Sequence, residues 1–312
     1  MRRAFIRRCC AAALAASSPV HASLSVTLPG WVCKHPDAIY ANGFEAGQGA
    51  VPGDPSNGGG GAYPSDRTRT LHIAGLGTGT QNYYLYLPQK YTPAHAWPFV
   101  LVLHGVAPWA TRASYAMAIR DDWSSVAEAG GFIVAAPVAD AQVDVGGTPG
   151  ATWLVPPTSG PNDYDLFAAV LADVEAAYNI ERTRLYAWGF SAGGMVTHDL
   201  GVNTYSNAFN ASTLAAYSVS AGDLAGLVCE GLTGTQCGQL LDALPRRIPV
   251  DIHIGTMDPN YGYAQNDHAL FLAHGWVDGQ TIFYNTFAGG HTYSVGDLQS
   301  AWAHLCPNAV TP

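Results

Sequence analysis

The sequence predicts an α/β fold, in which a mainly parallel sheet is covered by helices on both faces. From about residue 66 onward, short and wholly apolar segments alternate with segments of helical periodicity. Strands that are apolar throughout are typical of parallel sheets, because both of their faces are buried. Residues 185–194 add a second observation: an apolar run turns sharply through Gly-x-Ser-x-Gly and continues into a helix start.

The expected elements follow one another over about 247 residues, from 66 to 312, which form one catalytic domain large enough for a sizeable core. A glycine-rich stretch, Gly75–Gly79, precedes a strand and not a helix, so we interpret it as a hairpin turn and not as a nucleotide-binding loop. The expected strands are Leu71–Ile73, Tyr83–Leu87, Pro98–Leu103, Phe132–Ala136, the run beginning at Leu185, Leu214–Val219, Pro249–Ile254 and Thr281–Phe287. The clearest expected helices are Ser114–Ala129, Asp163–Tyr178, the segment after Ser191, and Leu298–Leu305.

Residues 1–22 are expected to be a signal peptide. Four arginines precede a short apolar stretch, and Val20-His21-Ala22 fits a cleavage site. The paired Arg2-Arg3 resembles the twin-arginine type of export signal. Residues 23–46 form a short N-terminal segment, and residues 47–65 are rich in glycine and proline, as in a linker. The protein is therefore expected to be secreted or periplasmic.

The net charge of the chain narrows the classes of molecule that it is expected to bind. Removing residues 1–22 takes away four of the 14 basic residues and no acidic one, so the net charge moves from −9 to −13. Such a chain is expected to bind neither nucleic acid nor an anionic membrane, and its oligomeric state stays open.

Four cysteines remain after removal of residues 1–22, and they allow three pairings. Proximity favours Cys229 with Cys237, which leaves Cys33 for Cys306.

The turn at Ser191 is predicted to be a nucleophile elbow. Glycines at positions 189 and 193 let the backbone turn tightly between strand and helix, so the hydroxyl projects above the sheet. An attacking serine needs a base and a group that orients the base. Sites in such sheets lie at the carboxyl ends of strands, so the base and its orienting acid are expected just after the later strands.

Asp258 and His291 are the predicted acid and base. Asp258 follows the strand 249–254, and His291 follows Gly289-Gly290 after the last strand. The chain order Ser, Asp, His is that of the α/β-hydrolases. Other acids fit less well: Asp251 stands at the wrong end of its strand, and Asp267 and Asp278 resemble solvated surface acids.

An oxyanion hole is expected from two backbone amides. Ala192 begins the helix after the nucleophile, and Val106 lies in the loop after the strand 98–103. Further side chains in loops at this edge of the sheet are expected to contact substrate, since aromatic faces suit acyl chains, phenolic rings and sugars. These are Trp109, Trp153, Tyr261 and Tyr293, although any one of them could instead pack in the core. His104 is grouped with them, but it is expected to shape the loop more than to take part in the chemistry. No Cys-x-x-Cys or His-x-x-x-His spacing exists, so neither a metal nor another cofactor is expected.

Four motifs together resemble a known esterase family. The resemblance is to the secreted α/β-hydrolases that group polyhydroxybutyrate depolymerases with the feruloyl and acetylxylan esterases of carbohydrate esterase family 1. It covers roughly residues 80–305 and implies an α/β-hydrolase without a large lid, acting on esters of extracellular polymers. The motifs are His104-Gly105, Gly189-Phe190-Ser191-Ala192-Gly193-Gly194, Gly255-Thr256-Met257-Asp258 and Gly289-Gly290-His291-Thr292-Tyr293.

The predicted function is that of a serine esterase working through an acyl-enzyme. The first expectation for the substrate is a polyhydroxyalkanoate-type polyester or its oligomers, and the alternative is a feruloyl or acetyl ester on plant polysaccharide. Two further alternatives stay open: an acyltransferase, which would exclude water from the acyl-enzyme, and a non-catalytic binding protein that keeps the hydrolase fold.

Overall fold

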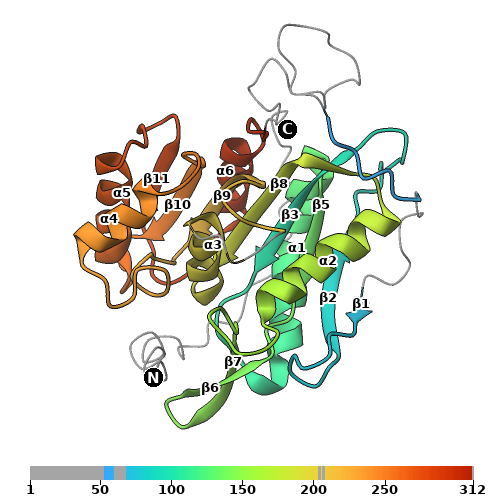
Figure 1. The fold of residues 1–312 in the computed structure, drawn as a ribbon, viewed down its shortest axis with the longest axis horizontal. Coiled ribbons are helices and arrows are strands. Elements are labelled where there is room, and N and C mark those ends of the chain that lie inside the picture. The colour runs from blue at the N-terminus through green and yellow to red at the C-terminus, as the bar shows by residue number, and fades with distance from the viewer. Residues whose placement is uncertain (1–52, 60–67, 203–204, 206–207, 311–312) are drawn as a thin grey trace, which may run out of the picture.

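A computed structural model describes residues 53–59, 68–202, 205 and 208–310. Its centre is an eight-stranded sheet in the order β1-β2-β5-β3-β8-β9-β10-β11 (Figure 1). The pairs β1–β2 and β2–β5 are antiparallel, and all pairs from β5 to β11 are parallel. The strands are β1 Thr68–Leu71, β2 Gln81–Tyr86, β3 Trp97–Leu103, β5 Ile133–Pro137, β8 Ile180–Phe190, β9 Leu214–Ser220, β10 Val250–Gly255 and β11 Ile282–Phe287.

Helices cover both faces of this sheet, as predicted (Figure 1). The core on one face packs α2, α3, α4 and α5, and the core on the other packs α1 and α6. Successive residues of a strand enter opposite cores: Phe99 and Leu101 face the first, whereas Val100 and Val102 face the second. The helices are α1 Arg112–Gly130, α2 Asp163–Ala177, α3 Ala192–Val202, α4 Gly234–Asp242, α5 Tyr261–Ala273 and α6 Val295–Leu305.

A second, three-stranded sheet was not predicted. It consists of β4 Ala107–Pro108, β6 Ala141–Val145 and β7 Thr148–Thr152, paired antiparallel in the order β4-β7-β6. The β6–β7 hairpin turns at Gly146 and Gly147, whose φ values of 61° and 86° lie in the left-handed region that glycine adopts readily. Since β4 follows the loop after β3, this hairpin is attached directly to the predicted oxyanion loop.

The N-terminal regions fall largely outside the described residues. The predicted signal peptide, the segment 23–46 and Cys33 all lie there. Residues 53–59, inside the predicted linker, are docked on the catalytic domain: Asp54 donates its amide to Glu181, and Ser56 donates its amide to the carbonyl of Ile180. This part of the stretch 47–65 is therefore held against β8, unlike the flexible linker that its composition indicates.

Cys229 and Cys237 form a disulfide, as proximity predicted. Cys306 is also disulfide-bonded, and its predicted partner Cys33 lies outside the described residues, so that pairing stays a prediction.

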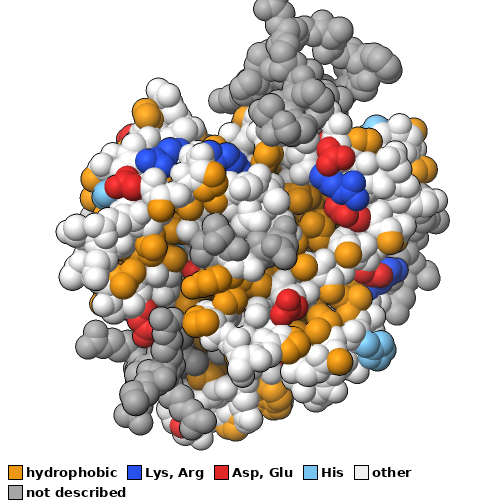
Figure 2. All heavy atoms as spheres, viewed as in Figure 1, with side chains coloured by type: hydrophobic (Ala, Val, Ile, Leu, Met, Phe, Trp, Pro, Cys, Tyr) orange, Lys and Arg blue, Asp and Glu red, His pale blue; other side chains and the backbone are white. Residues whose placement is uncertain are grey.

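On the face drawn in Figure 2, most Lys and Arg side chains lie in small groups beside Asp or Glu. No helix within the described ranges is both long and apolar enough to cross a bilayer.

Candidate active site

Ser191 occupies a strained turn between β8 and α3. Its φ is 56°, a left-handed value that a residue with a side chain adopts only at a cost of order 1–3 kcal/mol. Gly193, two residues later, lets the start of α3 lie close to the end of β3, because a Cβ at this position would lie 2.2 Å from the carbonyl oxygen of Leu103. The amide of Ser191 donates to the carbonyl of Ser220 at 2.9 Å, which fixes the turn to β9. The backbone thus presents this hydroxyl at the carboxyl edge of the sheet.

The three side chains that the sequence singled out form one hydrogen-bonded series. The Nδ1–H of His291 donates to Oδ2 of Asp258 at 2.9 Å, and the hydroxyl of Ser191 lies 2.8 Å from Nε2 of the same ring. An ionised carboxylate can only accept, so it fixes the proton on Nδ1 and leaves Nε2 free to accept from the serine. The Asp258 side chain is fully buried, whereas that of His291 is 21% exposed.

Glycines allow the acid and base loops to meet. A Cβ at Gly255, the last residue of β10, would lie 2.4 Å from the carbonyl oxygens of Gly289 and Gly290. The two loops are joined by backbone hydrogen bonds, in which the amide of Met257 donates to the carbonyl of Gly289 at 2.8 Å. Asp258 also accepts the amide of Asn260 at 2.8 Å, which orients its carboxylate. This contact between loops places the imidazole over the serine.

The loop after β3 lies directly beside the serine. A Cβ at Gly105 would come 2.9 Å from the Cβ of Ser191, so only glycine fits this approach. His104 is fully buried: its Nε2 accepts the amide of Ala139 at 3.1 Å, and its Nδ1–H donates to the carbonyl of Gly105 at 2.6 Å. Burial lowers the pKa of His104 to about 4, so the ring is neutral. The ring shapes the loop from inside, as expected, and its complete burial contradicts only the further expectation of a substrate contact.

Trp153 supports the same loop from below. Its indole N–H donates to the carbonyl of His104 at 2.8 Å, and its ring packs edge-on against Phe167. With 6% of its surface exposed, Trp153 is a core residue beneath the loop and has little surface to offer a substrate. Leu154, the residue after Trp153, donates its amide to the carboxylate of Asp163, which is buried at the start of α2. Burial raises the pKa of Asp163 to about 7.

The two predicted oxyanion donors lie in the two segments next to Ser191, the start of α3 and the loop after β3. Ala192 is the first residue of α3, and the amides of a helix's first turn have no acceptor within the helix. Val106 follows Gly105 and packs its side chain on Val143 and Val145 of the β6–β7 hairpin. The hairpin thereby holds the segment that carries the Val106 amide. That these two amides bind an oxyanion stays a prediction.

The remaining predicted substrate contacts are partly buried. Trp109 lies in the segment after β4, with the guanidinium of Arg112 4.0 Å from the centre of its ring. Tyr261 begins α5, three residues after Asp258. Tyr293 packs edge-on against Phe190, and its hydroxyl donates to a carboxylate of α1 at 2.7 Å. That these three side chains contact the substrate stays a prediction.

Three further side chains near the site were not described correctly by the sequence: the acids Asp267 and Asp251, and the apolar Met257. Asp267 is 5% exposed and accepts the amide of Leu224, so the expectation of a surface acid is wrong. Burial raises the pKa of Asp267 to about 8. Asp251 is buried in a cluster with His253, which sequence reasoning did not single out. Met257, beside the acid, exposes 74% of its surface; it belongs to one of the four motifs, but it was not among the expected substrate contacts.

Comparison with known proteins gives one partial sequence match and many structural ones. No protein-family model matches the sequence. A bifunctional acetylxylan esterase/xylanase of Neocallimastix patriciarum is 30% identical over 115 residues, which are 37% of this chain and 15% of that protein. The match therefore spans a small part of that longer relative.

Two solved structures illustrate the structural similarity. A ferulic acid esterase superposes with a TM-score of 0.56 at 15% identity, covering 77% of this chain and 95% of the other. A carbohydrate esterase family 1 ferulic acid esterase of Anaeromyces mucronatus gives 0.53 at 16% identity, with coverages of 80% and 91%. The parallel sheet, the helices on both its faces and these similarities establish that the chain has the α/β-hydrolase fold and resembles the feruloyl and acetylxylan esterases.

Proposed function

We propose that the protein is a serine esterase that cleaves carboxylic esters through an acyl-enzyme, with Ser191 as nucleophile, His291 as base and Asp258 as its orienting acid. One observation carries the proposal: the imidazole of His291 bridges the buried carboxylate and the serine hydroxyl at 2.9 and 2.8 Å. A hydroxyl at this distance from an accepting imidazole nitrogen can lose its proton as it attacks a carbonyl carbon.

The reaction runs in two halves at the same atoms. In the first, the oxygen of Ser191 bonds to the ester carbonyl carbon, while its proton moves to Nε2 of His291. The amides of Val106 and Ala192 donate to the negative carbonyl oxygen of the tetrahedral intermediate. The intermediate collapses, and the alcohol leaves with the proton from Nε2. In the second half, water takes the place of the alcohol and releases the acid, which restores the serine hydroxyl.

We infer that the esters lie on an extracellular polysaccharide, as feruloyl or acetyl groups. The proteins compared above are described as ferulic acid esterases and as an acetylxylan esterase/xylanase. None of the three is described as acting on a polyester, so the polyhydroxyalkanoate substrate becomes the alternative. Between β9 and β10 the structure has a single helix, α4, and this supports an open groove that admits part of a long chain. Trp109, Met257, Tyr261 and Tyr293 are the side chains proposed to contact the substrate.

Chemical labelling tests the nucleophile. A fluorophosphonate probe should label the protein once, at Ser191, and Ser191→Ala should abolish labelling and lower turnover by a factor on the order of 10⁶. A variant of a serine away from the site, Ser124→Ala, serves as the control, because its hydroxyl bonds only within α1. An alanine variant at position 191 that kept a tenth of the activity would exclude this nucleophile.

A substrate panel tests the ester class. Methyl ferulate, acetylxylan, hydroxybutyrate polymer and 4-nitrophenyl acetate should be compared at equal enzyme concentration. The proposal expects release of ferulate or acetate, with little soluble product from the polyester. Hydrolysis of the polyester alone would favour the alternative substrate. Transfer of the acyl group to an added alcohol in preference to water would indicate an acyltransferase. Inertness toward every ester would indicate a binding protein.

A further inference from the structure

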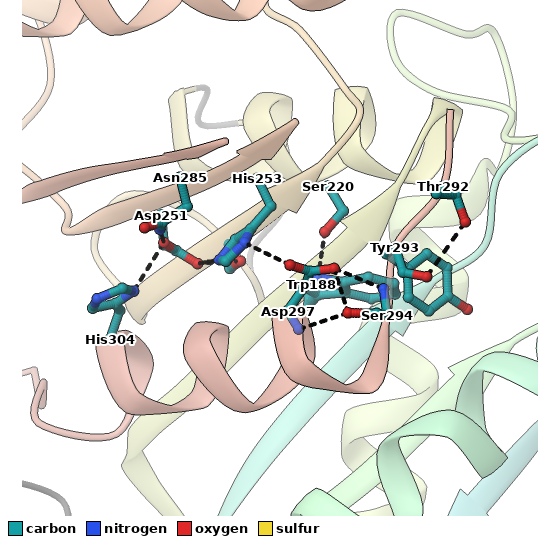
Figure 3. Close-up of polar contacts among 11 residues, drawn as sticks. Trp188, Ser220, Asp251, His253, Asn285, Thr292, Tyr293, Ser294, Asp297 and His304 are labelled. Carbon is teal, nitrogen blue, oxygen red and sulfur yellow. Dashed lines mark hydrogen bonds and ion pairs between the residues drawn. The ribbon is translucent and has the colours of Figure 1, made fainter. Parts of the chain in front are cut away.

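A second group of acids and histidines, outside the proposed triad, joins β10 to α6 (Figure 3). Its centre is Asp251 of β10, whose carboxylate accepts four hydrogen bonds. Oδ1 accepts from Asn285 at 2.7 Å and from His304 at 2.9 Å, and Oδ2 accepts from Ser218 and from His253, both at 2.8 Å. Although two histidines and an aspartate could bind a metal, these four donors already use the carboxylate lone pairs. We therefore interpret the group as an ion-pair cluster.

His253 stands between two carboxylates. Its Nε2 contacts Asp251 at 2.8 Å, and its Nδ1 faces Oδ1 of Asp297 at 3.6 Å. A neutral ring would turn a bare nitrogen lone pair toward one of these anions, whereas the protonated ring presents an N–H to each. Burial by itself would lower the pKa of His253, but the two carboxylates raise it to about 9. At neutral pH the cluster therefore holds a buried imidazolium.

Asp297 connects this cation to the loop that carries the base. It is the third residue of α6, and its Oδ2 accepts both the amide and the hydroxyl of Ser294, each at 2.7 Å. Ser294 in turn caps the helix by accepting the amide of Asp297 at 3.3 Å. His291 precedes this cap by three residues. Figure 3 shows the series from His304 through the two carboxylates to Ser294.

Tyr293, one of the two residues between the base His291 and the cap Ser294, is fixed as well. The ring of Tyr293 packs against Trp188 and Phe190 with centroid distances of 5.1 and 5.0 Å, and its hydroxyl donates to Asp122 of α1. Phe190 also packs on the ring of His291 at 5.0 Å. A shift of the helix start would therefore be transmitted to the imidazole, which must remain within hydrogen-bond distance of the serine.

We propose that His253 is a positioning residue for the proposed reaction: its imidazolium, held by Asp251, anchors Asp297 and the Ser294 cap and so keeps His291 aligned with Ser191. The proposal rests on the esterase function proposed above. The charged or titratable groups that face His253 in the described part of the chain are Asp251 on its own strand and Asp297 and His304 on α6. The adjacent strands β9 and β11 contribute Ser218 and Asn285, which do not titrate.

The test compares variants of the full chain with 4-nitrophenyl acetate and with the fluorophosphonate probe. His253→Gln and Asp297→Asn should each lower kcat and the rate of Ser191 labelling about 10-fold, with KM changed less than about twofold. The double variant should be no slower than the slower single variant, because both changes break one ion pair. The wild-type rate should fall as pH rises through about 9, where His253 loses its proton, and His253→Gln should lack this decrease.

A matched control separates positioning from a general effect of losing a histidine–aspartate pair. His268→Gln removes such a pair with Asp278 on the far side of β11 from the cluster, and should keep wild-type kcat. Wild-type kcat in His253→Gln, or losses that multiply in the double variant, would overturn the inference. Should His253→Gln fail to fold, Asp297→Asn carries the test, because its side chain is 17% exposed. Wild-type protein that neither hydrolyses esters nor reacts with the probe would refute the proposed esterase function itself.

Discussion

Two histidine–aspartate pairs lie at the last parallel strands, and their chemistry differs although their distances do not. His291 contacts Asp258 at 2.9 Å, and His253 contacts Asp251 at 2.8 Å. The difference lies at the second ring nitrogen. That of His291 faces the hydroxyl of Ser191, from which it can accept a proton, whereas that of His253 faces another carboxylate.

The partner on the far side of the ring decides what such a pair can do. A neutral ring between a carboxylate and a hydroxyl can take up and return a proton within one reaction cycle. A ring between two carboxylates holds its proton and becomes a fixed cation. Exposure follows the same division: the His291 side chain is 21% exposed and that of His253 is 2% exposed.

The largest expected effect is on turnover at the first pair. His291→Ala should lower kcat by a factor on the order of 10⁶, because the serine loses its general base. The His253→Gln variant should lose about five orders of magnitude less. Burst kinetics with 4-nitrophenyl acetate measure both. If His291→Ala stayed within a hundredfold of wild type, the two histidines would not differ in the way the geometry indicates.

Exchanging each aspartate for asparagine should separate catalysis from stability. Asp258→Asn should reduce kcat by roughly 10⁴, since the amide no longer fixes the Nδ1–H tautomer of His291. Asp251→Asn should instead lower the free energy of unfolding by about 3–5 kcal/mol, because it leaves a buried imidazolium without its nearest anion. Its kcat should stay within about tenfold of wild type. Urea denaturation beside steady-state kinetics gives both quantities, and equal patterns in the two variants would remove the distinction.

The sequence was enough to identify the first pair as a candidate and not the second. Asp258 and His291 follow apolar strands directly, so the rule that sites lie at the carboxyl ends of strands selects them. Asp251 lies near the amino end of its strand, and its donors come from β9, β11 and α6, which no local pattern links. The alternation of strands and helices along the chain was predictable because periodicity is a local property of the sequence. The buried cluster was not predictable, because burial depends on which elements pack together.

Other differences have similar causes. The β6–β7 hairpin carries a local signal, because Val143 and Val145 alternate with polar residues before Gly146-Gly147, a pattern typical of a strand that ends in a tight turn. Trp153 carried none for its position, because its hydrogen-bond partner is a backbone carbonyl 49 residues earlier in the chain. An aromatic residue near the site can equally line a groove or support the loop above it.

The free energy of unfolding is expected to depend on pH through His253. The pKa of His253 is raised in the folded protein to about 9 from an unfolded value of about 6.5, so its ion pairs contribute fully below pH 6.5. That contribution is lost as pH rises through 9. The difference in unfolding free energy between wild type and His253→Gln should therefore shrink steadily between pH 6.5 and 9. Urea titrations at half-unit pH intervals would show this, and a constant difference would mean that His253 is neutral in the folded state.

The smallest expected effect concerns a single donor to the buried carboxylate. Ser218 is fully buried and donates its hydroxyl to Asp251, so Ser218→Ala should lower the free energy of unfolding by about 1.5 kcal/mol, the usual value for a hydrogen bond to a charged group. Three donors remain and keep the carboxylate ionised, which is why the loss should be no larger. The control Ser124→Ala removes a hydroxyl that bonds a carbonyl at the surface, and should change stability by less than about 0.5 kcal/mol. Turnover should be unchanged in both variants, because neither hydroxyl contacts Asp297 or the loop of His291. A Ser218→Ala protein as stable as the control would mean that Asp251 is held by its histidines alone.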